Sequence, residues 1–193
     1  SSSDTAKRRP NILADGDAGQ RLMTYLAEKV RFEGMQGFLN SVDSYPQLRG
    51  IQTNLYKCFI VRSWWLGHDV GASGLLHPDG LFDDPKGGAL RESVYHRLAA
   101  RFRFTNQLLL FSEITNHVTW SLCIYQTRDE EVGFWLLASL VHPVTIQPSL
   151  DHDGHGSTPG IKNEMFEWDR SGHANRLVFI SEEALAAFSE LLD

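Results

Sequence analysis

The residues best suited by type to hold a metal lie in one short loop, Asp151 to His155, which contains two histidines and two aspartates. His152 and His155 have a spacing that zinc sites use, and zinc requires three or four protein ligands. No third ligand is identifiable from the sequence, and glycine-rich loops also collect His and Asp because these residues favour turns. Cys58 and Cys123 form no Cys-x-x-Cys pair. We therefore expect no metal site, and two buried free thiols.

A concentration of arginines stands out on a chain whose formal net charge is -6. These residues are Arg91, Arg97, Arg101 and Arg103. Clustered arginines commonly contact the phosphates of nucleic acids, so the sequence suggests DNA phosphate contacts here. The alternative is that they form only the exposed side of an amphipathic helix.

A third group of polar residues follows a short apolar strand expected at residues 73–77. Ligand clefts of open α/β sheets lie beyond the carboxyl ends of such strands. We therefore predict a cleft loop that comprises His77, Pro78, Asp79, Asp83, Asp84 and Lys86. The alternative is a solvated connection between two elements.

Hydrophobic periodicity predicts the elements that would position these groups. A helix is expected from about residue 18, weakened at Gly34 and Gly37. Further helices are expected over residues 53–66 and 89–101, and a last one capped by Ser181. The later strands are expected at residues 104–110, 118–125, 132–141 and 175–180.

This order of elements predicts a single α/β fold. A strand-helix-strand unit favours a parallel sheet, and the two strands joined by the turn at residues 112–117 suggest an antiparallel edge on it. A chain of 193 residues with 42% hydrophobic content can bury one sizeable core. Its longest apolar runs are too short to cross a bilayer, and no signal peptide is visible, so we expect a cytoplasmic protein without membrane partners.

Four segments occur in an order that resembles a known enzyme family. They are TNLYKCFI at residues 53–60, GLLHPDG at 74–80, ALR at 89–91, and Phe111 followed by VTWS at 118–121. Together they resemble the later half of the catalytic domain in adenine-specific DNA methyltransferases of bacterial restriction–modification and phage-defence systems. The resemblance runs from Thr53 to Tyr125.

The resemblance implies a fold, an activity and one site residue. The fold would be the second half of a Rossmann-like methyltransferase sheet with an antiparallel terminal strand pair, followed by a small C-terminal α+β appendage. Residues 1–50 would be an N-terminal tail and helix, 51–142 the half-domain, and 143–193 the start of a target-recognition segment. The activity would be transfer of a methyl group from S-adenosylmethionine to the exocyclic amine of a flipped adenine. Phe111 would stack on the extruded base.

The chain also departs from the family. It contains neither a Gly-rich turn after a first strand nor an Asn-Pro-Pro-aromatic tetrapeptide. We therefore expect no catalytic or cofactor-binding residue here, no S-adenosylmethionine on this chain alone, and partners that comprise DNA and the upstream half of the same methyltransferase or a partner subunit. The alternatives are a non-catalytic DNA-binding or scaffolding subunit, or a general protein-interaction domain. For Phe111 itself, the alternative is a core residue that ends the apolar run Leu108–Leu110.

Overall fold

The computed structural model describes residues 17–52 and 54–190, which fall into two compact units divided after Pro46. The first unit contains one long helix, α2 (Ala18–Leu39), which continues through Gly34 and Gly37. The expected weakening at these glycines was wrong. Nearly every described side chain of α2 is exposed, and Phe38 packs edge-on against Tyr45.

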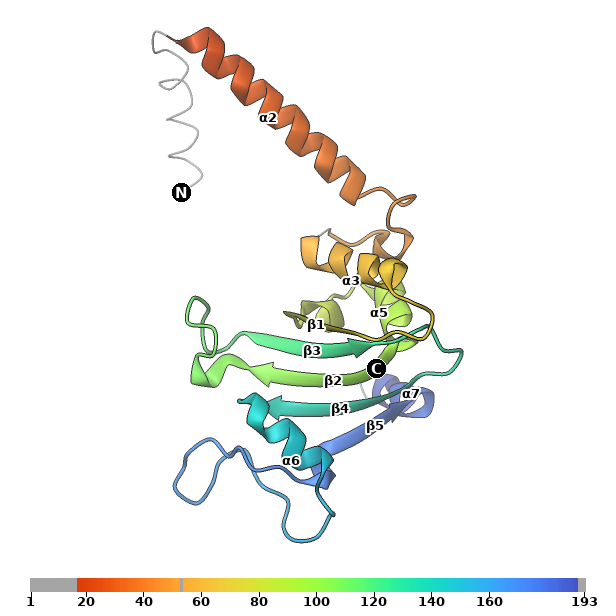
Figure 1. Cartoon of the computed structure of the whole chain (residues 1–193), viewed down its shortest axis with the longest axis vertical. Coiled ribbons are helices and arrows are strands. Elements are labelled where there is room, and N and C mark those ends of the chain that lie inside the picture. The colour runs from red at the N-terminus through yellow and green to blue at the C-terminus, as the bar shows by residue number, and fades with distance from the viewer. Residues whose placement is uncertain (1–16, 53, 191–193) are drawn as a thin grey trace. The chain divides into compact units, whose positions relative to one another are not determined.

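The second unit is built on a mixed five-stranded sheet (Figure 1). Its strands are β1 (Ser73–Pro78), β2 (Leu98–Thr105), β3 (Thr119–Tyr125), β4 (Gly133–Leu140) and β5 (Leu177–Ser181). Their spatial order is β1-β3-β2-β4-β5, with β2 and β4 parallel and the other neighbours antiparallel. The expectation of an α/β fold is therefore confirmed.

Strand β3 has a position that the sequence did not predict. It pairs antiparallel with β2, as expected, but it also pairs antiparallel with β1 on its other side. Strands β1 and β2 consequently run in the same direction with a reversed strand between them. The antiparallel pair is thus internal, and the expectation of an edge pair was wrong.

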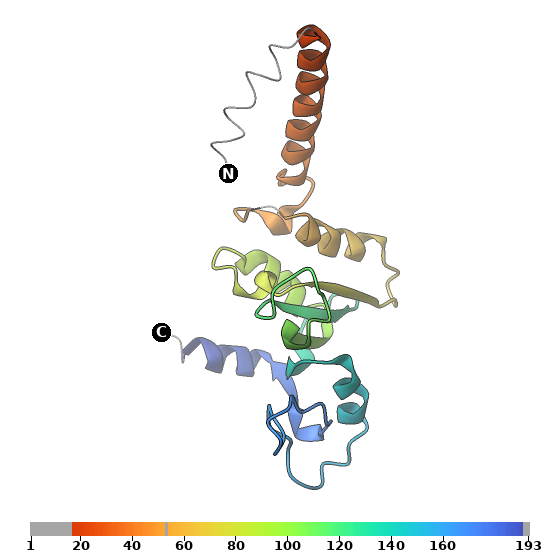
Figure 2. The same ribbon diagram turned by 90° about the vertical axis from the view of Figure 1, so that its left-hand side faces the viewer.

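Helices cover the two faces of this sheet unequally (Figure 2). One face carries α3 (Leu55–Leu66), α4 (Gly80–Asp83) and α5 (Gly88–Tyr95), through contacts such as Trp64 with Tyr125 and Tyr95 with Phe134. The other face carries the short helices η3 (Pro143–Thr145) and α6 (Ile146–Leu150) over an apolar cluster. That cluster comprises Phe102, Phe104, Trp120, Leu137 and Leu140.

Part of the second face remains uncovered in the described part of the chain. One register row crosses all five strands through Gly74, Ile124, Ala100, Trp135 and Phe179. In this row, Trp135 is 48% exposed and Phe179 is 51% exposed. The row thus forms an apolar strip whose end on β4 and β5 is open to solvent among the described residues, while Ala100 and Ile124 pack against the apolar cluster.

The helix expected over residues 89–101 was wrong in its second half. Helix α5 ends at Tyr95, and β2 begins at Leu98. From Arg101 to Phe104, charged and aromatic residues alternate, which is the period of a strand. Pairing with β3 and β4 on both sides therefore prevails over the four-residue spacing of Leu90, Val94 and Leu98.

The segment after β2 also differs from the expected strand at residues 104–110. Strand β2 stops at Thr105, and a short helix, η2 (Asn106–Leu108), begins a loop that continues to Val118. Leu109 adopts a left-handed conformation with φ of 50°. Phe111 therefore lies in a loop and does not end a core strand.

The end of the described chain follows the prediction. Helix η4 (Ala174–Arg176) leads into β5, and α7 (Glu182–Glu190) follows it. The Ser181 hydroxyl accepts a hydrogen bond from the Ala184 amide at 3.4 Å, as an N-cap does. None of the described helices is long and apolar enough to span a bilayer.

Candidate functional site

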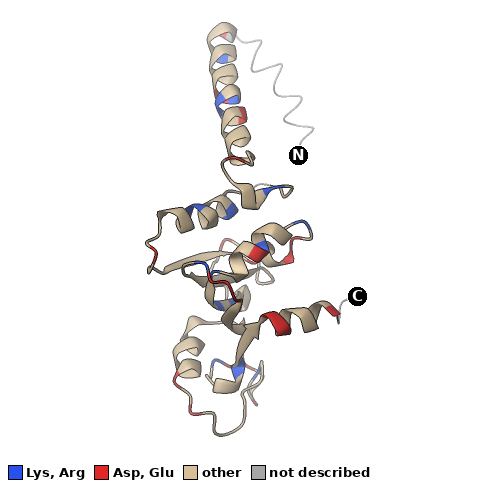
Figure 3. Cartoon of the chain, turned by 90° about the vertical axis from the view of Figure 1, so that its right-hand side faces the viewer, with Lys and Arg blue, Asp and Glu red and all other residues tan. Residues whose placement is uncertain are grey.

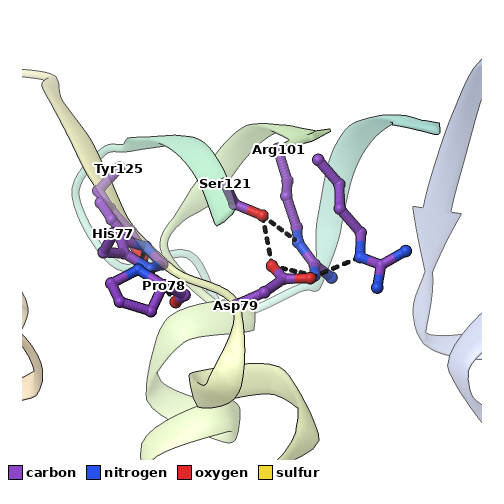
Figure 4. A network of polar contacts seen from close by, with 7 residues as sticks. His77, Pro78, Asp79, Arg101, Ser121 and Tyr125 are labelled. Atoms are coloured by element: carbon purple, nitrogen blue, oxygen red, sulfur yellow. Dashed lines mark hydrogen bonds and ion pairs between the residues drawn. The ribbon is translucent and has the colours of Figure 1, made fainter. Parts of the chain in front are cut away.

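A buried carboxylate lies at the carboxyl end of β1, where the sequence predicted a cleft loop (Figure 4). Asp79 is 1% exposed and accepts hydrogen bonds from three side chains. The Arg101 guanidinium donates at 2.7 Å, the Arg103 Nε at 2.5 Å and the Ser121 hydroxyl at 2.5 Å. These partners come from β2 and β3, so the network joins three adjacent strands.

One carboxylate meets two guanidinium groups in this network, which therefore carries one excess positive charge. Burial raises the pKa of the Asp79 carboxyl, but the bond from Ser121 and the two arginines outweigh it and leave the pKa below its ordinary value. Arg101 also lies over the Phe82 ring, with 3.4 Å between its Cζ and the ring centroid. An ionised carboxylate with three donors is a poor proton acceptor, so Asp79 acts as a structural anchor for the strand ends.

His77 is the second buried polar residue at this strand end. Its Nε2 lies 3.0 Å from the Tyr125 hydroxyl and its Nδ1 2.9 Å from the Pro78 carbonyl oxygen. Its ring stacks between Tyr56 and Tyr125, with centroid separations of 5.9 and 6.3 Å. Burial lowers the pKa of His77, and burial also raises the pKa of the Tyr125 hydroxyl well above its ordinary value. Both groups are therefore neutral at physiological pH.

The remaining residues of the predicted cleft loop separate into two kinds. Asp84 forms an ion pair with Lys57 of α3 at 2.7 Å, and this bond is the main reason that the pKa of Asp84 lies below its ordinary value. Asp83, the last residue of α4, and Lys86, in the loop that follows, are exposed. The segment thus begins with buried anchors and continues as a solvated connection.

Phe111 lies beside this strand end, over an apolar groove of about 200 Å³. The groove is lined mainly by Leu76, Pro78, Phe111, Ile114, Val118 and Trp120. Phe111 is 36% exposed and meets Trp120 edge-on, with 5.2 Å between the ring centroids. Trp120 stacks in turn on Phe104 at 4.1 Å, so a buried aromatic pair supports the exposed ring.

One buried side chain holds the Phe111 loop in shape. Asn106 is fully buried, and its Nδ2 donates to the carbonyl oxygens of Phe111 at 2.9 Å and Ile114 at 3.1 Å. Its Oδ1 accepts from the Phe111 amide at 3.1 Å. The backbone that carries the aromatic ring is therefore fixed from both sides.

The four predicted phosphate-binding arginines do not form one patch. Arg91 on α5 donates to the Asp84 carbonyl oxygen, and Arg101 and Arg103 on β2 pair with Asp79. Arg97, between α5 and β2, donates to the Ser93 carbonyl oxygen. Positive charge is dispersed over the described elements (Figure 3). The expected amphipathic helix with a basic side is thus absent from the described residues, because β2 begins within its predicted range.

The histidine loop, residues 151–155, does not bring together enough ligands for a metal ion. His155 is exposed, and the His152 ring lies 4.1 Å from the ring of His173. Among the described residues, no group of three His, Cys, Asp or Glu side chains could hold a metal ion. Cys58 and Cys123 are buried free thiols, as expected.

Three site residues escaped the sequence analysis: Lys57, Asn106 and Tyr125. Lys57 is 6% exposed within the segment TNLYKCFI, where a lysine every few residues is unremarkable in a helix. Asn106 follows a strand, and an asparagine there suggests a turn without showing which loop it will hold. Tyr125 sits at the alternating buried positions of β3, so its burial was predictable, but its bond to His77 was not.

The arrangement can bind a flat apolar group, and the polar side chains next to it, Asp79, His77 and Tyr125, are hydrogen-bonded to other groups of the protein. The groove presents an exposed aromatic ring, while the neighbouring carboxylate, imidazole and phenol are saturated or neutral. No protein-family model matches this chain, and no curated protein matches it.

Proposed function

We propose that this chain is the later half of the catalytic domain of a DNA adenine methyltransferase of a bacterial restriction or anti-phage system, and that Phe111 stacks on a flipped adenine. The observation that carries the proposal is the supported, part-exposed Phe111 ring over an apolar groove at the carboxyl end of β1. Ligand clefts of α/β sheets lie at such strand ends.

The order of strands also supports this proposal. The family resemblance implies that residues 118–121 belong to the later strand of an antiparallel pair. Strand β3 is antiparallel to both β1 and β2. The Rossmann-like character of the complete sheet is part of the same proposal.

Under this proposal, the chain contributes a binding surface and no chemical group. S-adenosylmethionine would supply the methyl group from a site on the upstream half or a partner subunit, which would also hold the target amine. Asn106 would fix the backbone of Phe111 through hydrogen bonds, and Trp120 would hold the Phe111 ring through its edge-on contact. Stacking on an aromatic ring is worth about 1–3 kcal/mol per base, which would stabilise the extrahelical adenine.

The test is methylation by the whole reading frame that includes this chain. Transfer of a labelled methyl group to adenine should fall about five- to 150-fold in Phe111→Ala, as the stacking energy implies. Phe111→Tyr and Phe111→Trp should keep most of the activity, because stacking needs a flat ring and no hydrogen bond. A fluorescent adenine analogue at the target position should report less flipping in the Ala variant.

Phe188 provides a control for this test. It is a 51% exposed phenylalanine of α7 that belongs neither to the groove nor to the register row of Trp135 and Phe179. Phe188→Ala should leave methylation unchanged. A whole reading frame that transfers no methyl group to DNA, or a Phe111→Ala variant with full activity, would contradict the proposal.

A non-catalytic scaffolding or DNA-binding subunit remains a second candidate, and the uncovered strip through Trp135 and Phe179 favours it. Exposed apolar strips of this kind mark interaction surfaces. The two candidates differ in the Phe111 experiment. A scaffolding subunit would lose assembly when Trp135 or Phe179 is replaced, and Phe111→Ala would not change its function.

A further inference from the structure

A second cavity lies at the other end of the same strands, away from Phe111. It has a volume of about 260 Å³ and is lined by the end of α3, the loop that leads into β1, and the residues after β3. A hydrogen bond from the Thr127 hydroxyl to the Asp69 carbonyl oxygen joins the two loops at this cavity. The volume corresponds to that of about eight water molecules in the liquid, enough for a small oxyanion with part of an attached group.

This cavity is separate from the groove at Phe111. Ser73 and Tyr125, the first residue of β1 and the last of β3, line the cavity, whereas Pro78 and Thr119, at the opposite ends of these strands, line the groove. Strands of this length span about 17–20 Å. A ligand in the cavity would therefore not contact Phe111.

Arg97 is the central charged residue of the cavity wall. It is half-buried, its Nη1 donates to the Ser93 carbonyl oxygen at 2.9 Å, and its Cζ lies 4.6 Å from the centroid of the Trp64 ring. Burial, and then the nearby charge of Arg128, lower its pKa below the ordinary value. The protein thus holds a partly desolvated cation in one orientation against an aromatic ring.

Arg128 brings a second positive charge to the same wall. It is exposed, and no ion pair joins Arg97 or Arg128 to a carboxylate anywhere in residues 17–52 and 54–190. Asp69 also lines the cavity, but it pairs with neither guanidinium. Two uncompensated arginines near each other repel, and an anion between them would remove that cost.

We propose that this cavity binds an oxyanion of the phosphate class between Arg97 and Arg128, with the Trp64 ring holding Arg97 in place. Guanidinium groups suit phosphate because their donors match its oxygens in pairs, and arginine on an aromatic ring is already ordered before the ligand arrives. The phosphate could belong to a small molecule or to the backbone of a nucleic acid, and the test separates these sources.

The experiment follows the indole N–H resonances of the chain during titration at constant ionic strength. The Trp64→Phe variant assigns the Trp64 resonance among the five tryptophans. The probes are inorganic phosphate, deoxyadenosine monophosphate and a thymidine octanucleotide, with chloride as the blank. We expect a saturable shift of the Trp64 resonance. A response to phosphate and the mononucleotide identifies a small-molecule site, and a response to the octanucleotide alone identifies a phosphodiester site.

Charge variants show whether the two arginines cause the shift. Arg128 is exposed, so the Arg128→Gln variant should fold normally. It should bind the anion at least about tenfold more weakly, which is the effect of losing one charge-assisted hydrogen bond. Arg97→Lys should also weaken it, since an ammonium group cannot bind bidentately. Arg62 is the control, because it is an exposed arginine of α3 that does not line the cavity. The Arg62→Gln variant loses the same charge and should bind the anion as tightly as the parent does. No saturable shift with any probe, or equal affinity in Arg128→Gln and the parent, would overturn the proposal.

Discussion

At the scale of single residues, the site depends on polar groups whose partners are distant in sequence. Asp79 was predicted as a cleft residue, but its donors lie 22, 24 and 42 residues further along the chain. No local pattern links these positions, because the link is made by the register of β2 and β3 against β1. Sequence could therefore propose the residue types of this network and could not reveal that Asp79 forms ion pairs with two of the predicted phosphate-binding arginines.

Replacing Asp79 tests whether the network stabilises the fold. Asp79→Asn leaves Arg101 and Arg103 near each other with no counter-charge, and removing one partner of a buried ion pair costs about 3–5 kcal/mol. We expect a loss of this size in denaturant unfolding at neutral pH. Asp83→Asn is the control, because Asp83 is exposed at the other end of α4 and its replacement should change stability by less than about 0.5 kcal/mol.

The same pair of variants predicts a dependence on pH. The pKa of Asp79 is lowered in the folded protein, so its stabilising effect is complete above the ordinary Asp range and is lost as pH falls through the folded value. The difference in the free energy of unfolding between the parent and the Asp79→Asn variant should be constant near neutral pH and should shrink below about pH 4. A gap that stays the same down to pH 2 would show that the carboxylate charge has no part in it.

At the scale of elements, the sequence predicted the strands better than the helix that precedes β2. β1, β3, β4 and β5 lie within about two residues of their predicted positions, because alternating or apolar runs are bounded by Gly, Pro and polar turns. The helix over residues 89–101 failed, since Leu98 continues the helical spacing but is buried as the first residue of β2. Tertiary pairing decided this segment, and it moved the strand before Phe111 from residues 104–110 to Leu98–Thr105.

The loop that carries Phe111 depends on Asn106, and its replacement should show this. Asn106→Ala leaves the Phe111 amide and several loop carbonyls without partners, which should lower stability by about 1–3 kcal/mol. Asn106→Asp should be at least as damaging, because a carboxylate would face those carbonyl oxygens. In the whole reading frame, both variants should lower methylation more than stability alone explains, measured well below their melting temperatures.

A second loop residue gives the control for this experiment. Leu109 is 54% exposed and has φ of 50°, a conformation that glycine adopts without strain. Leu109→Gly should therefore leave stability unchanged or slightly raised, with methylation retained. If Leu109→Gly and Asn106→Ala had the same effect, general loosening of the loop would explain both, and the specific role of Asn106 would be rejected.

At the scale of the whole molecule, one end of the described sheet carries an apolar groove, and part of one sheet face stays exposed at Trp135 and Phe179. Sequence patterns predicted the α/β unit from local periodicity, and they predicted a cleft loop from the position of its residues after β1. They could not indicate that β4 and β5 extend the sheet beyond β2, or that Trp135 and Phe179 remain exposed among the described residues. Such features depend on which elements meet in space.

The proposal of a half-domain makes this strip its most direct test. If an upstream half completes the domain, it should cover the apolar strip or pair with the outer edge of β1, and Trp135 should lose its contact with solvent. In the chain alone, the part of the tryptophan emission removed by Trp135→Phe should be strongly quenched by iodide, since Trp135 is 48% exposed. In the whole reading frame, that same part should be shielded, and the amides of β1 should exchange with deuterium more slowly than in the chain alone. Trp135→Glu should then leave this chain folded, because the residue is exposed, but should prevent assembly of the active enzyme. Equal quenching and equal exchange in both proteins would mean that the five strands are the complete sheet, and the half-domain would have to be abandoned in favour of a separate subunit.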